Sequence, residues 1–174
     1  MPDRQNEFEQ AALPHTGDLL RCARRLTGNT TVAEDLVQES LLNAWRSFHQ
    51  LREGSNARAW LYRIMVNNWF NDLRRAKRAP AVEIRRVAGG AHAAAEINQA
   101  LDQLPEEQRA AFLLVVVQGF TCQEGADILG IPIGTVMSRI SRARDALRGK
   151  LSAGRKGTAA AASSRIRRMP DDVS

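Results

Sequence analysis

Basic side chains gather in three short segments of this chain, and their chemistry is that of phosphate binding. Residues 74–86 carry a net charge of +5, residues 139–150 carry +4 and residues 155–168 carry +5. These segments total +14, so the rest of a chain with net charge +6 sums to −8. Lys and Arg concentrated in this way bind nucleic acid by displacing counterions from its phosphates. Any one segment could be a solvated helix face, but three against an acidic remainder favour a DNA or RNA partner.

The middle basic segment belongs to a predicted helix-turn-helix over residues 121–150. Thr121 and Glu124 form a capping box that opens a short helix. Gly130 can take the left-handed conformation of a tight turn, and Pro132 suits the start of a second helix. The inward face of that second helix is apolar: Val136, Ile140, Ala143 and Leu147. Its outward face carries Met137, Ser138, Ser141, Arg142 and Arg144, with Arg148 further along.

Such an outward face is typical of a helix that reads the major groove of DNA. Arg pairs with guanine, Ser contacts several base edges, and Met can touch a thymine methyl group. The alternative is an ordinary helical hairpin with a solvated basic face. The geometry alone favours DNA binding over that alternative.

No group of side chains has the spacing that catalysis or metal binding needs. Cys22 and Cys122 lie 100 positions apart, and the three histidines have no metal-ligand spacing. The pair Gly89 and Gly90 is not followed by the Gly-Lys-Ser/Thr of a phosphate-binding loop. There is also no apolar run of the ~20 residues that span a bilayer, and no signal peptide. We therefore expect a cytoplasmic protein that is not an enzyme, with no metal, no cofactor and no membrane insertion.

The elements that position these residues are predicted to be helices throughout. An apolar stripe ends at Gly28, and a capping box of Thr31 and Glu34 opens a helix that runs to Phe48 with an acidic outer surface. A long helix from about Ala57 to Arg78 follows. Pro80 stops it, and the Ala/Gly-rich residues 79–95 indicate a linker. We expect an all-α fold of two small helical domains joined by a flexible linker.

Several motifs resemble the extracytoplasmic-function (ECF) sigma factors of bacterial RNA polymerase. Three segments resemble the C-terminal DNA-binding domain of that family: LPEEQR at 104–109, GIPIGTV at 130–136 and SRISRAR at 138–144. The other domain of the family is resembled by AEDLVQE at 33–39 and AWLYRI at 59–64. The two sets stand in the expected order and cover roughly residues 15–152.

The resemblance implies a factor that binds core RNA polymerase, recognises the minus-35 and minus-10 promoter elements and promotes transcription initiation. An anti-sigma factor is a further expected partner. The implied domains are an N-terminal extension (1–14), a sigma region 2-like domain (15–78), a linker (79–93), a sigma region 4-like helix-turn-helix domain (94–152) and a basic disordered tail (153–174).

The resemblance also implies which residues make each contact. The candidates for core polymerase are Glu34, Asp35, Gln38 and Glu39. The candidates for the minus-10 element are Asn56, Arg58, Arg63 and Asn67, with Arg74, Arg75, Lys77 and Arg78 on phosphates. The candidates for reading the minus-35 element are Met137, Ser138, Ser141 and Arg142, with Arg139, Arg144 and Arg148 on the DNA backbone.

Two positions depart from the family pattern. Position 137 is often basic in the family but is Met137 here, and Gly125 stands where a larger aliphatic residue is usual. Gly costs about 1 kcal/mol of helix propensity against Ala, which predicts a less stable first helix in the motif.

An alternative function is a helix-turn-helix transcriptional regulator that is not a polymerase subunit, but such a regulator would need a ligand-binding or dimerisation domain.

Overall fold

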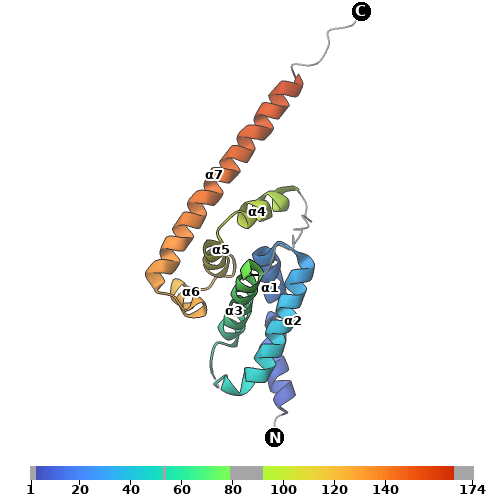
Figure 1. Cartoon of the computed structure of the whole chain (residues 1–174), viewed down its shortest axis with the longest axis vertical. Helices are drawn as coiled ribbons and strands as arrows, with labels where there is room; N and C mark the ends of the chain where they lie inside the picture. The colour runs from blue at the N-terminus through green and yellow to red at the C-terminus, as the bar shows by residue number, and fades with distance from the viewer. Residues whose placement is uncertain (1–2, 53, 79–91, 167–174) are drawn as a thin grey trace, which may run out of the picture.

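The computed structural model describes residues 3–52, 54–78 and 92–166, and all regular structure within these ranges is helical. The N-terminal unit consists of α1 (Arg4–Thr27), α2 (Thr30–Ser47), the short 3₁₀ helix η1 (Phe48–Gln50) and α3 (Ala57–Arg78). The C-terminal unit consists of α4 (His92–Asp102), α5 (Glu106–Phe112), the π-helix η2 (Leu113–Val117), α6 (Cys122–Leu129) and α7 (Ile133–Ile166). The all-α prediction is confirmed (Figure 1).

The turn between α1 and α2 is made by two residues whose types fit it. Gly28 has φ 66°, a left-handed conformation that costs glycine no steric strain, and its N–H donates to the carbonyl of Arg24. Asn29 is extended and accepts a hydrogen bond from the N–H of Val32 at 3.1 Å. The helix therefore begins at Thr30 with Asn29 as its cap, and not with the predicted box of Thr31 and Glu34.

The core of the N-terminal unit is largely aliphatic. Its fully buried side chains include Leu19, Leu26, Met65 and Val66, with Tyr62 from α3. Residues 4–14, predicted as an extension, continue α1 as one helix. Phe8 from this segment packs edge-to-face on Trp45 and Phe48, with ring centroids 5.3 and 5.4 Å apart.

In the C-terminal unit, the predicted helix-turn-helix is present. The capping box of Thr121 and Glu124 opens α6, and Gly130 closes it with φ 65°. The four predicted inward residues of α7 are buried, as expected: Val136, Ile140, Ala143 and Leu147. The helix then continues to Ile166, through part of the segment predicted to be disordered. Alanines at 159–162 favour helix there, because Ala has the highest helix propensity.

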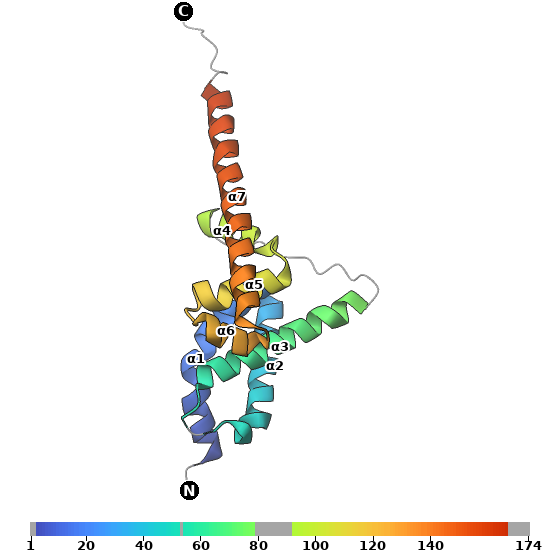
Figure 2. The ribbon, with the colours of Figure 1, turned by 90° about the vertical axis from the view of Figure 1, so that its left-hand side faces the viewer.

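The two units pack directly against each other. One buried cluster joins Leu19 and Leu26 of the N-terminal unit to Leu104, Leu114 and Phe120 of the C-terminal unit. Figure 2 shows α6 lying beside α3, while the far end of α7 projects away. Most of the predicted linker, residues 79–91, lies outside the described residues. Among the helices described, none is long and apolar enough to cross a membrane.

Candidate nucleic-acid and protein interfaces

The outward face of α7 is open to solvent along its first five turns. Met137 is 58% exposed, and Ser138, Ser141 and Arg142 are exposed as well. The hydroxyl of Ser138 donates to the carbonyl of Thr135 at 3.0 Å, which is a bond within the same helix. The predicted base-reading side chains thus share one accessible helix face.

The arginines around that face differ in their surroundings. Arg139 is half-buried and pairs with Glu107 of α5 at 2.6 Å, so it braces α7 against α5. Arg144 and Arg148 are exposed, and Arg148 lies 3.9 Å from Asp145 in a solvated pair. Solvated pairs of this kind are weak and can exchange for phosphate contacts. Arg139 alone among the three already has a close partner from another helix.

Gly125 of α6 has a steric role that the sequence did not reveal. A Cβ atom at this position would lie 2.9 Å from Cγ2 of Val115, closer than side chains pack. Val115 belongs to η2, whose π-helical geometry brings it against α6. The glycine therefore allows the close approach of two helices, and its low helix propensity is offset by that packing.

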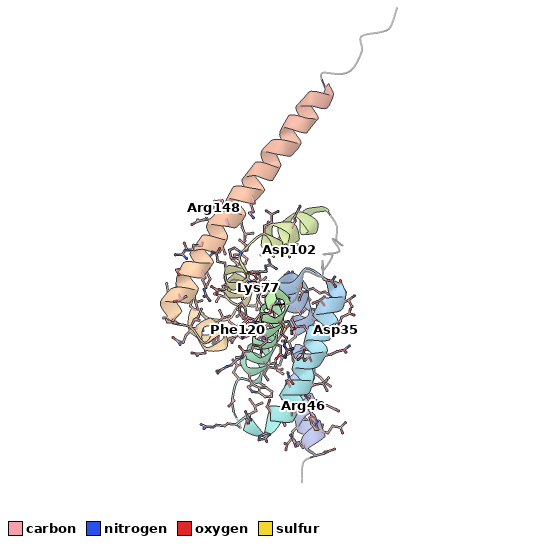
Figure 3. All side chains as sticks on the ribbon, viewed as in Figure 1. Asp35, Arg46, Lys77, Asp102, Phe120 and Arg148 are labelled. Carbon is pink, nitrogen blue, oxygen red and sulfur yellow. The ribbon has the colours of Figure 1, made fainter. Side chains whose placement is uncertain are left out.

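The acidic face of α2 is exposed over its length. Glu34, Asp35, Gln38 and Glu39 are all solvent-facing, and Glu34 lies 3.4 Å from Arg24 of α1. In Figure 3, Asp35 points away from the C-terminal unit, whereas Phe120 lies on the opposite side of the N-terminal unit. The predicted polymerase-facing residues are thus brought together and left accessible.

An apolar groove beside this acidic face was missed from the sequence. It has a volume of about 590 Å³ and is lined by Phe8, Leu41, Leu42, Trp45 and Gln38, with Gln5 and Glu9 at α1. Leu42 is 56% exposed, which is high for a large aliphatic residue. The signal was present, since Leu41 and Leu42 are adjacent and cannot both face the core of one helix.

The start of α3 contacts the C-terminal unit as well as solvent. Asn56 caps the helix through a bond from the N–H of Ala59 at 3.0 Å, and its amide donates to Glu124 of α6 at 3.2 Å. Arg58 is half-buried and donates to the carbonyl of Gln118 at 2.6 Å. Its guanidinium also lies 4.0 Å from the ring centroid of Phe120, a cation–π contact. Two minus-10 candidates are therefore in contact with the C-terminal unit.

Tyr62, one turn after Arg58, completes this contact. Its hydroxyl donates to the side-chain oxygen of Gln118 at 2.7 Å, and its ring meets Phe120 edge-to-face at 5.0 Å. Burial raises the pKa of Tyr62 well above its usual range, so the phenol stays protonated. Residue spacing near Tyr62 does not indicate these partners, because Gln118 and Phe120 lie 56 and 58 residues further along the chain.

The other minus-10 candidates are exposed. Arg63 and Asn67 lie one turn apart on α3, on a different face from Arg58 and Tyr62. The basic end of the helix is also solvated, with Arg74 bonded to Asn71 at 2.6 Å and Arg75 lying 3.6 Å from Asp72. Lys77 approaches Glu106 of α5 at 3.7 Å, and Arg78 is exposed. The four basic residues at the end of α3 are therefore exposed and can contact DNA phosphates.

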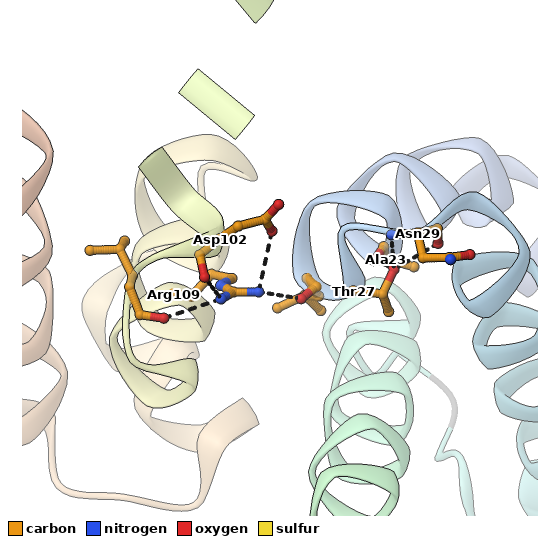
Figure 4. A network of polar contacts seen from close by, with 7 residues as sticks. Ala23, Thr27, Asn29, Asp102 and Arg109 are labelled. Atoms are coloured by element: carbon orange, nitrogen blue, oxygen red, sulfur yellow. Dashed lines mark hydrogen bonds and ion pairs between the residues drawn. The ribbon is translucent and has the colours of Figure 1, made fainter. Parts of the chain in front are cut away.

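A second polar contact between the units centres on Arg109 of α5. Arg109 is 2% exposed, and its guanidinium donates to three carbonyls: Leu26 at 2.7 Å, Asp102 at 2.6 Å and Leu104 at 3.1 Å. The carboxylate of Asp102 lies 3.6 Å away (Figure 4). Leu26 is in the last turn of α1, where the helix dipole favours a cation.

The described residues contain no cluster of His, Cys, Asp and Glu side chains that could hold a metal ion. Cys22 is fully buried, and burial raises the pKa of its thiol to about 12. A thiol in this state is a poor nucleophile and a poor metal ligand. Cys22 therefore serves as a small core residue.

Comparison with known proteins identifies both units. Residues 13–79 match the family model for sigma-70 region 2, and residues 94–147 match the model for sigma-70 region 4. The chain is 38% identical over 146 residues to the ECF RNA polymerase sigma factor EcfG of Rhodopseudomonas palustris, covering 79% of each protein. It is 36% identical over 143 residues to SigM of Mycobacterium tuberculosis, covering 79% of this chain and 73% of SigM.

Solved structures agree with these relatives. The sigma factor RpoE from Bartonella quintana, solved with the anti-sigma factor NepR, superimposes with a TM-score of 0.72 at 33% identity. The match covers 84% of this chain and 97% of RpoE. CnrH, solved with the cytosolic domain of CnrY, gives a TM-score of 0.68 at 28% identity and covers 86% of this chain and 90% of CnrH.

Proposed function

This chain belongs to the ECF sigma factors, and on that premise we propose how its surfaces share the work of binding core RNA polymerase and recognising promoters. Membership follows from the two region matches and from relatives more than 30% identical over most of both chains. The match over residues 13–79 also disfavours a helix-turn-helix regulator that is not a polymerase subunit. We also propose the division into an extension before residue 15, a linker over 79–93 and a minus-35 domain over 94–152, which the matches over 13–79 and 94–147 support.

Core polymerase binds the acidic face of α2 in this proposal. Asp35, Gln38 and Glu39 are exposed on one side of the helix, and the groove of Leu42 and Trp45 lies beside them. An apolar strip flanked by acids is complementary to an amphipathic helix with basic side chains. Glu34 contributes less, because Arg24 already neutralises part of its charge.

The minus-35 element is read by α7. Met137, Ser138, Ser141 and Arg142 supply contacts to base edges, because they share the accessible face of a helix that follows a tight turn. Arg144 and Arg148 contact phosphates. Arg139 acts mainly by holding α7 on α5 through Glu107, and this modifies the phosphate role expected from the sequence.

The minus-10 element is held along α3. Asn56, Arg58, Arg63 and Asn67 supply polar groups for unstacked bases. The basic end of the helix then binds phosphates: Arg74, Arg75, Lys77 and Arg78. Positive charge at one end and neutral amides at the other suit a strand that leaves the duplex along the helix.

An anti-sigma factor is a further partner in this proposal, since RpoE and CnrH were each solved with a regulatory protein. The protein performs no chemistry of its own and acts in the cytoplasm, where core polymerase is found. The observation that carries the proposal is the pairing of a region 2 match with a region 4 match in one chain.

Transcription in vitro tests the proposed surfaces. The chain is added to core polymerase with a promoter pool randomised at both elements, and the transcripts are sequenced. We expect transcripts only when the chain is present, with bases enriched at two positions along the DNA. Transcription that is no higher with the chain than with core polymerase alone would contradict the proposal.

A further inference from the structure

We propose that Glu107 of α5 limits non-specific DNA binding by holding Arg139 of α7 away from DNA phosphates. This inference rests on the proposed role of α7 in minus-35 recognition. Arg139 follows Ser138 directly and precedes Arg142 by three positions, so it stands beside the face proposed to read bases. An arginine at such a place is suited to contact the DNA backbone. In the structure, its guanidinium instead donates to the carboxylate of Glu107 at 2.6 Å.

Arg139 and Arg148 of α7 each have an acidic partner, but the two ion pairs differ. Arg148 lies 3.9 Å from Asp145, and its side chain is 79% exposed. Such a solvated pair exchanges readily for a phosphate. The Arg139 side chain is only 19% exposed and makes a short charge-assisted hydrogen bond to Glu107. A phosphate that approached Arg139 would meet the negative charge of that bonded carboxylate at close range.

The place of Glu107 in α5 does not by itself account for this bond. Glu106 and Glu107 both stand in the first turn of the helix, where the helix dipole stabilises an acid. The carboxylate of Glu106 faces α3, at 3.7 Å from Nζ of Lys77. The dipole therefore applies to both acids, whereas the bond to Arg139 belongs to Glu107. Glu106 is for this reason a matched control for Glu107.

The position of α7 does not depend on the pair of Glu107 and Arg139 alone. The apolar face of α7 is buried in the core of the C-terminal unit. Further along the helix, Lys150 donates to the side-chain oxygen of Gln103 at 2.8 Å. Replacement of Glu107 should therefore free the guanidinium of Arg139 while α7 keeps its packing.

A withheld arginine is useful to a chain that has to find a few promoters. Each phosphate contact raises the affinity for every DNA sequence, and a genome offers a large excess of non-specific sites. With Arg139 held by Glu107, α7 makes fewer such contacts. More of the free chain then stays off non-specific DNA and is available to core polymerase.

The test is binding of the full chain to a duplex library randomised at the minus-35 element, at several salt concentrations. Glu107→Gln removes the charge and keeps the size of the side chain. One added phosphate contact steepens the salt slope by about 0.9, which is about fivefold in affinity at about 0.15 M salt relative to 1 M. We therefore expect Glu107→Gln to bind all library sequences about fivefold more tightly at that salt concentration, with the preferred bases unchanged.

Two controls separate this effect from a change in net charge. Glu106→Gln changes the charge by the same amount at the neighbouring position, and its affinity and salt slope should stay close to those of the parent. In an Arg139→Ala background, Glu107→Gln should leave the salt slope unchanged, because the arginine that it releases is absent.

Three results would overturn the inference. The first is an unchanged salt slope in Glu107→Gln. The second is an equal increase in Glu106→Gln or in the Arg139→Ala background, which would mean that net charge alone governs binding. The third is a change in the preferred bases without a steeper slope, which would mean that Glu107 orients α7 and does not withhold Arg139.

The same data distinguish failure of the inference from failure of the proposed function. A parent chain with no preference among the library sequences would refute the minus-35 role of α7, and the salt slopes would still decide the effect of Glu107. Circular dichroism and thermal melting identify a variant that has lost its fold. Glu107→Asp, which keeps the charge but shortens the side chain, then decides: the slope should steepen by less than one contact, and an unchanged slope would refute the inference.

Discussion

The two proposed DNA-binding surfaces of this sigma factor differ in how accessible their side chains are in the free chain. On α7, the side chains proposed to read the minus-35 element are exposed, with Met137 58% accessible and Arg142 free of contacts from other helices in the described residues. On α3, Arg58 is half-buried and bonded to Gln118, and Asn56 is bonded to Glu124. The α7 surface is open to solvent in the free chain, whereas part of the α3 surface is in contact with the C-terminal unit.

This difference follows from how each surface is built. The α7 face depends on local features, namely a cap, a glycine turn and an apolar stripe that fixes which side points outward. The α3 face depends on which distant segment packs against it, because Gln118 and Phe120 come from the other unit. A helix that binds duplex DNA can stay exposed, whereas side chains for an unstacked strand can be covered until melting begins.

The largest effect is expected from reversing charge on α2. Asp35→Lys with Glu39→Lys should weaken core-polymerase binding by at least about tenfold, because placing like charges against a basic partner costs several kcal/mol. Binding of the free chain to minus-35 duplex should change little, since α7 is untouched. Fluorescence anisotropy with labelled core polymerase measures the first quantity.

The matched control for this reversal changes the same number of charges elsewhere. Glu7→Lys with Asp127→Lys alters two exposed acids that lie outside the proposed polymerase surface. Equal losses in the two double variants would mean that net charge, and not the α2 surface, governs polymerase binding.

The next effect separates base reading from phosphate contact within α7. Arg142→Ala should relax the preference at one or two minus-35 positions and cost about 1–3 kcal/mol on the preferred sequence. Arg148→Ala should weaken all sequences about equally and lower the salt slope by about one unit. Binding to a randomised minus-35 library at two salt concentrations measures both. If the effects of the two variants are exchanged, the proposed phase of α7 in the groove is incorrect.

A third prediction concerns the packing that presents α7. Gly125→Ala should destabilise the chain by about 1–2 kcal/mol, because overpacking against Val115 outweighs a gain of about 1 kcal/mol in helix propensity. Adding Val115→Ala should relieve the clash and recover part of that loss. Urea unfolding followed by circular dichroism measures each free energy.

Gly134→Ala provides the control, since a Cβ at Gly134 meets nothing within 4 Å. Its effect should be neutral or stabilising. An equal loss at Gly125 and Gly134 would show that backbone conformation, and not contact with Val115, sets the cost.

The smallest effect is a loss of stability at alkaline pH in the N-terminal unit. Burial raises the pKa of Cys22 from 9.0 to about 12 and raises that of Tyr62 as well, so the folded state favours their neutral forms. This stability is present below about pH 9 and is lost as pH rises towards the folded pKa values. Urea unfolding followed by tryptophan fluorescence reports this unit, since all three tryptophans lie in it.

The urea concentration at the unfolding midpoint should decrease as the pH is raised from 8 to 10.5, and Cys22→Ala should make that decrease smaller. An unchanged midpoint would mean that both groups ionise freely in the folded chain.

In acid, Glu124 behaves in the opposite sense, because hydrogen bonds from Thr121 hold its pKa below the usual 4.5. Its capping contribution is present above that value and is lost as pH falls through the lower folded pKa.

The sequence predicted the parts that depend on local pattern. The extent of α3 from Ala57 to Arg78, the cap at Thr121 and the four buried residues of α7 were all accessible from spacing and residue type. The first cap was placed wrongly, because Thr31 with Glu34 and Asn29 are both good signals and only the turn at Gly28 decides between them. The helix at 153–166 was missed because glycines interrupt its alanines.

What the sequence could not predict are contacts between segments far apart in the chain. The partners of Arg58 and Asn56 lie 60 and 68 residues away, and nothing near α3 indicates them. The steric role of Gly125 depends on Val115, which is brought close by a π-helix that apolar spacing does not reveal. The ion pair of Arg139 with Glu107 likewise joins two helices whose approach is set by the core.

The most direct test compares DNA binding by the free chain with binding by its complex with core polymerase. The probes are a minus-35 duplex and a single-stranded minus-10 oligonucleotide, both taken from promoters selected in vitro. The free chain should bind the duplex weakly and with a steep salt dependence, and should gain appreciable affinity for the single strand only in the polymerase complex. If the free chain binds the single strand as tightly as the complex does, the two surfaces are equally prepared and the contrast between α7 and α3 is wrong.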